Sequence, residues 1–186
     1  MLVKRVNILF FFVIIIIFAL FGQQGDHMRI AMALIIAFIF SMTAFIFRWL
    51  TLDGAQSATV VGTVAFGLGE WKMALMLVVF FISASLISKK AIKTSEHSTQ
   101  VSRRTGEQVW ANGFWFACWI ILWSLTGEFV LLAAAAAAVA TATADTWATE
   151  VGTALGKSTY LIYRRRKVEP GTNGGISVPG TLAAAG

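Results

Sequence analysis

The stretch LLAAAAAAVATATADTWATEVG, residues 131–152, decides how the rest of the chain is interpreted. Its first half is apolar enough to lie in a bilayer, whereas its second half carries Asp145 and Glu150. A carboxylate at membrane depth is costly unless it is paired or reaches water. We therefore expect a membrane helix whose polar end is either functional or held by specific partners.

The composition extends this interpretation to the whole chain. Of 186 residues, 58% are hydrophobic and 13% charged, against about 25% charged in ordinary soluble domains. The chain is therefore expected to be an integral membrane protein. The first apolar run follows Lys4 and Arg5 as in a signal peptide, but FALFGQQG (18–25) offers no small-residue cleavage site, so a retained helix is expected. Cys118 is the only cysteine and excludes an intrachain disulfide.

The apolar segments predict an all-α membrane protein. A spanning helix needs about 20 mainly apolar residues, and the segments that meet or nearly meet this length are 6–22, 30–50, 71–88, 109–126 and 128–144. The small-residue segment 54–69 is either a short span inside the bundle or a re-entrant segment, and we favour the span. The expected fold is a polytopic bundle of about six spans, with 180–186 starting another helix in a single domain over 1–186.

Basic residues predict the orientation. If 54–69 spans the membrane, all 15 lysines and arginines except Arg29 and Lys72 lie on the same side as the N-terminus. The positive-inside rule makes that side cytoplasmic, together with the basic loops 89–107 and 157–177. The expected location is the cell membrane, with the N-terminus and motif loops in the cytoplasm. Nucleic acid is not an expected partner, since these residues are divided among loops without a recognised binding motif.

The polar end of the opening stretch predicts two separate faces. On a helix continuing to residue 156, Asp145 and Thr149 share a stripe, and Glu150 lies about 140° from Asp145. The two carboxylates should therefore not bind one ion from an unbroken helix. Asp145 is a candidate metal ligand and Glu150 a candidate positioning group. The alternatives are a salt bridge to lysine or arginine, or a helix cap.

A glycine-rich segment follows, KVEPGTNGGISVPGT over residues 167–181. Asn173, Gly174 and Gly175 tolerate positive backbone angles, which can aim successive N–H groups at an anion. Arg164, Arg165, Arg166 and Lys167 add positive charge. An ordinary turn leading into another helix remains the alternative, because Pro-Gly and Asn-Gly are common turn signals.

The third polar segment is RRTGEQVWANGFW, residues 103–115. Gln108 and Asn112 lie one helical turn apart, so both amides are expected to face one cavity. For Asn112, ligand contact and hydrogen bonding between helices remain equally open. Arg103 and Arg104 are further candidates for binding phosphate.

The motifs QVWANG, ADTWATEVG and PGTNGGISVPGT, in this order, resemble the prenyl-phosphate (phytyl-phosphate) kinase-like family of integral membrane proteins, many of which have unknown function. The resemblance covers roughly residues 30–186. This family usually continues through further membrane helices, so a C-terminally truncated chain is expected. A more distant similarity links Asp145, Gly156–Lys157 and Gly171–Gly175 to membrane cytidylyltransferases and CTP-dependent lipid kinases.

The resemblance implies a membrane-embedded transferase that phosphorylates a prenyl monophosphate from a nucleoside triphosphate, either CTP or ATP. Asp145 would bind Mg²⁺, which prefers carboxylate and phosphate oxygens. Glu150 and Lys157 would complete the catalytic residues. The implied nucleotide- and phosphate-binding residues are Asn112, Thr172, Asn173, Gly174, Gly175, Arg103 and Arg104. The partners are the bilayer, a prenyl-phosphate lipid and the nucleotide; neither the acceptor nor the oligomeric state follows from the sequence.

Two other classes of protein fit the same residues. A transporter of an anion or lipid also uses polar groups and broken helices at membrane depth. A noncatalytic membrane assembly protein is the third possibility, and there substitution of Asp145 should leave the activity of the associated complex unchanged as long as the protein folds.

Overall fold

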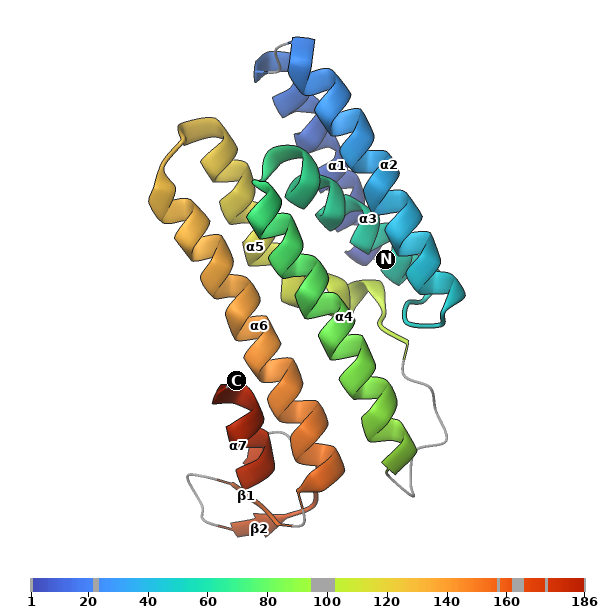
Figure 1. Cartoon of the computed structure of the whole chain (residues 1–186), viewed down its shortest axis with the longest axis vertical. Coiled ribbons are helices and arrows are strands. Elements are labelled where there is room, and N and C mark those ends of the chain that lie inside the picture. The colour runs from blue at the N-terminus through green and yellow to red at the C-terminus, as the bar shows by residue number, and fades with distance from the viewer. Residues whose placement is uncertain are drawn as a thin grey trace. The chain divides into compact units, whose positions relative to one another are not determined.

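The computed structural model describes residues 2–21, 24–94, 103–156, 158–161, 166–172 and 174–185. Within these ranges the chain forms the helices and strands labelled in Figure 1. They are α1 (Leu2–Phe21), α2 (Gln24–Ile46), α3 (Leu52–Thr63), η1 (Val64–Leu68), α4 (Trp71–Thr94), α5 (Gly106–Thr126), α6 (Phe129–Leu155), β1 (Thr159–Leu161), β2 (Arg166–Val168), β3 (Gly175–Ile176) and α7 (Val178–Ala185).

The helical membrane class is confirmed. The helices α1, α2, α4, α5 and α6 are each long and apolar enough to cross a bilayer. Large apolar side chains point outward along them, including Ile39 at 59% exposure and Val130 at 68%. Such outward-facing residues suit contact with lipid, where a helix satisfies all its backbone polar groups internally.

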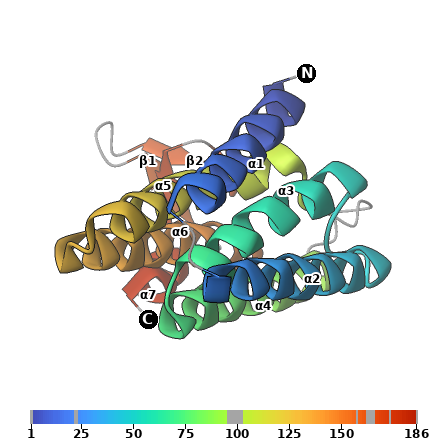
Figure 2. The same cartoon turned by 90° about the horizontal axis from the view of Figure 1, so that it is seen from above.

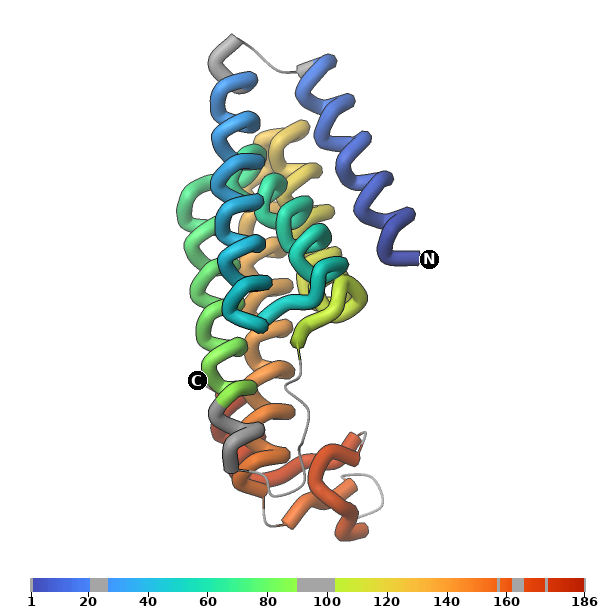
Figure 3. Tube along the Cα trace, turned by 90° about the vertical axis from the view of Figure 1, so that its right-hand side faces the viewer, coloured from blue at the N-terminus to red at the C-terminus, as the bar shows by residue number. Residues whose placement is uncertain are grey.

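The small-residue segment is a continuous helical element. The 12 residues of α3 pass into the five residues of the π-helix η1, which gives a length of about 25 Å. Figures 2 and 3 show this element beside α2 and running in the opposite direction. A Cβ added at Gly62 would lie 2.9 Å from the Cβ of Ala37, and one at Gly67 would lie 3.2 Å from that of Ala33. The segment therefore follows α2 along much of its length, as a short packed span would.

The chain groups into two compact units. The first contains residues 1–78 and 103–139, and its core includes Leu50, Phe116 and Ile120, each fully buried. The second contains residues 79–102 and 140–186. Both α4 and α6 contribute residues to each unit.

The second unit contains a small sheet that the sequence did not predict. The basic segment 157–177 was expected to be a loop, but β1 pairs antiparallel with both β2 and β3 in the order β2-β1-β3. After β3 the chain enters α7, which confirms the expected start of another apolar helix. Figure 1 shows α7 alongside the end of α6. The sheet thus returns the chain to α6.

Candidate functional site

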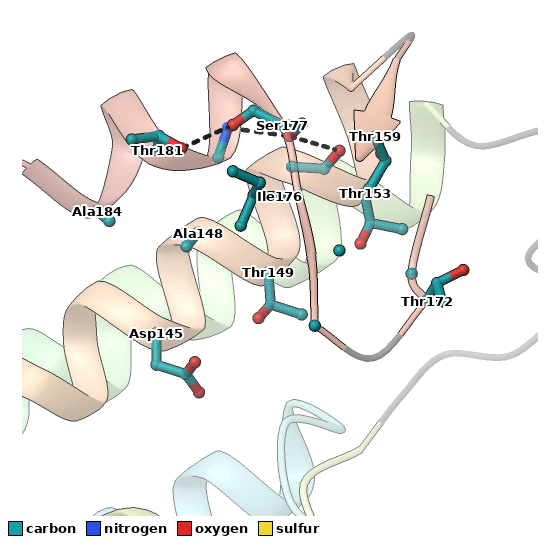
Figure 4. A pocket seen from close by; sticks show the side chains of 15 residues that line it. Asp145, Ala148, Thr149, Thr153, Thr159, Thr172, Ile176, Ser177, Thr181 and Ala184 are labelled. Atoms are coloured by element: carbon teal, nitrogen blue, oxygen red, sulfur yellow. Dashed lines mark hydrogen bonds between the residues drawn. The ribbon is translucent and has the colours of Figure 1, made fainter. Parts of the chain in front are cut away.

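A polar pocket of about 690 Å³ lies between the end of α6, the glycine-rich segment and α7 (Figure 4). All of its lining residues belong to the second unit. They are Asp145, Ala148, Thr149, Gly152, Thr153, Thr159, Gly171, Thr172, Gly174, Gly175, Ile176, Ser177, Gly180, Thr181 and Ala184. The pocket thus combines one carboxylate, several hydroxyls and many glycines.

The unbroken helix α6 places Asp145 on the pocket wall. The helix continues to Leu155, one residue short of the helix end assumed from the sequence. Asp145, Thr149 and Thr153 are exposed side chains that line the pocket. Figure 4 shows these side chains following one another along the helix. From Asp145 to Thr153 is about 12 Å along the axis, so the two ends of this row can contact different parts of one extended ligand.

Glu150 does not line this pocket. Its Oε1 accepts a hydrogen bond of 2.6 Å from the hydroxyl of Ser88, a buried residue of α4 in the same unit. The two carboxylates therefore occupy different faces of α6, as the helical spacing predicted. In this arrangement Glu150 joins two helices, and Asp145 is the carboxylate that a bound ligand can reach.

The glycine-rich segment forms a tight turn whose amides are partly engaged. Gly171 and Gly174 have φ of 88° and 76°, which favour glycine. The Thr172 amide donates to the Glu169 carbonyl at 3.2 Å, and the Gly175 amide donates to the Thr172 carbonyl at 2.9 Å. These two N–H groups stabilise the turn and are therefore engaged within it. Asn173, which the predicted anion nest includes, lies outside the described residues.

Glycines allow α6 and α7 to approach closely beside the pocket. A Cβ at Gly152 would lie 2.9 Å from the Ser177 Oγ, and one at Gly180 would lie 2.7 Å from the Ala148 carbonyl oxygen. Substituting either glycine would push against atoms of the opposite segment. The spacing of these small residues therefore sets the width of the pocket.

Asn112, Arg103 and Arg104 belong to the first unit and do not line the pocket. Asn112 is half-buried on α5. Arg104 is held by its backbone, because its N–H donates to the Trp49 carbonyl at 2.9 Å and its carbonyl accepts from the Thr51 N–H at 3.1 Å. Gln108 has a structural role at the start of α5, because its Oε1 accepts from the Thr105 N–H and closes a capping box.

Asp53 joins the starts of two helices in the first unit. Its carboxylate accepts from the Thr51 hydroxyl at 2.6 Å and from the Gly106 N–H at 2.8 Å. These two hydrogen bonds hold the pKa of Asp53 below its ordinary value of 3.8. Asp53 precedes the apolar segment 54–69 and links α3 to α5, so its local role is structural.

Four residues named from the sequence lie outside the described residues: Lys157, Asn173, Arg164 and Arg165. Among the residues that are described, no three His, Cys, Asp or Glu side chains gather into a metal cluster. Asp145 is the single carboxylate among the described residues that line the pocket. A single carboxylate fits Mg²⁺, which commonly binds through one or two carboxylates, substrate phosphates and water.

The first unit contains a second, smaller cavity of about 240 Å³. Its walls come from α1, α2 and α3, and most of its lining is apolar. The contributing residues are Phe11, Ile14, Leu34, Phe38, Met42, Gln56, Thr59, Val60 and Thr63. Its chemistry suits a hydrocarbon chain.

Comparison with known proteins places the chain in a family. Residues 35–186 match the family described as Integral membrane protein DUF92. The chain belongs to this family. Its motif resemblance to prenyl-phosphate kinase-like membrane proteins is consistent with this membership.

Relatives of this DUF92 protein occur in bacteria, archaea and plants. It is 32% identical to an uncharacterized membrane protein of Synechocystis sp. over 73% of the chain and 55% of the relative. It is 29% identical to an uncharacterized membrane protein of Methanocaldococcus jannaschii, over 73% of the chain and 57% of the relative. It is 26% identical to Protein PGR of Arabidopsis thaliana over 87% of the chain and 62% of the relative. The chain thus spans little more than half of these relatives, and no solved structure matches it.

The pocket of this DUF92 protein includes two residues that were not named as candidates from the sequence, although Ser177 lies within the glycine-rich motif. Thr159 and Ser177 line it, and both are buried. The alternation of buried Thr159 with exposed Tyr160 is a strand signal. It covers only three residues, which is too short to be recognised without its partner strands.

Proposed function

We propose that this DUF92 protein is a membrane-embedded, kinase-like transferase that phosphorylates a prenyl monophosphate, such as phytyl phosphate, from CTP or ATP. The observation that carries the proposal is the pocket in which Asp145 and the Gly171–Gly175 segment lie together. They belong to two of the three motifs on which the family resemblance rests. Their convergence supports a shared binding site for phosphorylated ligands.

The proposed reaction transfers one phosphoryl group. An oxygen of the lipid monophosphate attacks the γ-phosphorus of the nucleotide, the bond to the β,γ-bridging oxygen breaks, and the nucleoside diphosphate leaves. Catalysis of such a transfer rests mainly on positioning and on neutralising charge. Mg²⁺ would supply that neutralisation, and Asp145 would hold it from the wall formed by α6.

The other residues would position the phosphates. Thr149 and Thr153 offer hydroxyls along α6, and Thr172, Gly174 and Gly175 shape the opposite wall. Asn173 belongs to the glycine-rich motif, and Lys157 comes from the more distant similarity through Gly156–Lys157. Both remain proposed phosphate contacts, with Lys157 also proposed as a catalytic residue. Glu150, held by Ser88, would fix the orientation of α6 relative to α4 within the second unit and so act as a positioning residue.

Three residues of the first unit keep proposed roles on the strength of the resemblance. Arg103 and Arg104 would attract phosphate, and Asn112 would contact the nucleotide or the acceptor. The basic face of the membrane protein would be cytoplasmic, where nucleotide is available, and the acceptor's hydrocarbon chain would remain among apolar helices.

The proposal is tested with purified protein in lipid nanodiscs, supplied with phytyl, geranylgeranyl or farnesyl monophosphate, CTP or ATP, and Mg²⁺. The expected product is the corresponding prenyl diphosphate. Asp145→Asn should lower turnover by about two orders of magnitude or more, and higher Mg²⁺ should restore only part of it. Thr149→Ala, one turn away on the same wall, serves as the matched control and should have a milder effect.

The same preparation separates the alternatives. Flux of an anion or lipid across liposomes without nucleotide turnover would indicate a transporter. Normal turnover in folded Asp145→Asn protein would remove the metal-binding assignment. Absence of product with every acceptor and nucleotide would count against the kinase proposal as a whole.

A further inference from the structure

Two buried hydroxyl residues belong to the lining of the pocket. Thr159 is 4% exposed and Ser177 is 7% exposed. Thr159 begins β1, and Ser177 directly follows β3, the strand that pairs with β1. Both residues line the pocket (Figure 4). They form what we call the hydroxyl pair.

The hydroxyl of Thr159 has no partner within the described part of the chain. Its Oγ1 is buried and makes no hydrogen bond to any residue that the structure describes. Native proteins satisfy the large majority of buried polar groups, so such a hydroxyl requires an explanation. The methyl group of Thr159 packs closely against Gly175, because a Cβ added at Gly175 would lie 2.7 Å from the Thr159 Cγ2.

The hydroxyl of Ser177 is only weakly engaged as a donor. It accepts from the Gly180 N–H at 3.3 Å and lies 3.5 Å from the Gly152 carbonyl. The second distance exceeds the usual O–H···O range of about 2.5–3.0 Å. A closer acceptor in the pocket would therefore take this hydrogen, and the side chain is already confined by Gly152 of α6 and by Gly156, which follows the helix.

The pair can satisfy a ligand rich in acceptor oxygens. Both residues line a cavity that also contains Asp145, the proposed Mg²⁺ ligand. The amides of Thr172 and Gly175 are already used within the turn. Hydroxyls are thus the donors that the described lining most clearly leaves for a phosphate.

We propose that Thr159 and Ser177 bind oxygens of a phosphate group in this pocket. The inference rests on the proposed function and adds a phosphate-binding subsite to it. The phosphate belongs either to the nucleotide or to the prenyl monophosphate, and both present the same acceptor oxygens. Filling the pocket provides the hydrogen-bond partner that Thr159 lacks.

The test uses Thr159→Val, which keeps the methyl packing and the shape of the side chain but removes the hydroxyl. Equilibrium binding to the full chain in nanodiscs is measured for Mg²⁺–CTP, Mg²⁺–ATP, inorganic pyrophosphate and phytyl monophosphate. The dissociation constant of at least one probe should rise about tenfold, as expected for loss of a hydrogen bond to a charged group. Thr159→Ser should restore binding, since it keeps the hydroxyl.

A matched control and a stability measurement separate binding from folding. The Ser85 hydroxyl on α4 is also buried, has no partner among the residues that the structure describes, and does not line the pocket, so Ser85→Ala should leave every dissociation constant unchanged. Thr159→Val should keep or raise the thermal midpoint, because it removes an unsatisfied buried polar group. A purely structural Thr159 would instead lose stability and leave the affinities unchanged.

The outcomes also distinguish the subsite from the kinase proposal. Weakening of CTP or ATP binding alone assigns the pair to the nucleotide, and weakening of phytyl monophosphate binding alone assigns it to the acceptor. Weaker binding in a protein that never forms a diphosphate would support the subsite and refute the kinase. Unchanged affinities in Thr159→Val, no recovery in Thr159→Ser, or no binding of any probe to the unaltered protein would overturn the subsite.

Discussion

The contact between α6 and α7 predicts the effect of Gly180→Ala. The new Cβ would lie 2.7 Å from the carbonyl oxygen of Ala148 and 3.1 Å from the Cα of Gly152, whereas ordinary contact begins at 3.4 Å. Backbone atoms cannot rotate away as a flexible side chain can. The two helices must therefore separate locally by roughly the difference between these distances and an ordinary contact distance. Overpacking of this kind costs about 1–3 kcal/mol, which corresponds to a fall in Tm of roughly 2–12 °C for a chain of this size.

The assay is thermal unfolding of detergent-solubilised protein, followed by tryptophan fluorescence, together with binding of Mg²⁺–CTP. Separation of the helices widens the pocket, so affinity should fall along with Tm. Ala185→Ser is the matched control, because it adds one heavy atom to an exposed position of the same helix. If Gly180→Ala protein had the Tm and affinity of the unaltered chain, the close packing of α7 on α6 would be refuted.

Three further predictions concern topology, acid stability and the glycine-rich turn. With Cys118 replaced, a single cysteine at Glu128 should react with an impermeant reagent on intact cells and one at Ser158 should not; the opposite pattern would reverse the proposed orientation. The lowered pKa of Asp53 means that its ionised form stabilises the fold above pH 3.8 and that this contribution is lost as the pH falls below it. Asp53→Asn should therefore lower Tm at pH 7 and reduce the further loss on acidification to pH 3; equal losses in both proteins would contradict this. Gly174→Ala places a side chain at a residue whose φ is 76° and should lower Tm through about 1 kcal/mol of backbone strain. Unchanged Tm and unchanged binding would contradict this prediction.

Local sequence properties determined the membrane class and most of the helical spans. Lipid offers no hydrogen-bond partners, so an apolar segment of sufficient length must satisfy its own backbone as a helix. The same local reasoning correctly extended α6 beyond Asp145 and separated that residue from Glu150, because helical spacing alone sets the angle between them. It also recognised the motifs that place the chain in its family.

Tertiary structure decided which polar residues meet. The strands β1, β2 and β3 contain three residues or fewer, so no periodic pattern could identify them, and their pairing depends on the chain reversing twice. That pairing joins Tyr160 to Ile176 and so brings the residues beside them, Thr159 and Ser177, into the lining of one pocket. The packing of α4 against α6 gives Glu150 its Ser88 partner. These contacts join residues that are separate in the sequence, whereas hydropathy and helical periodicity describe only neighbours along the chain.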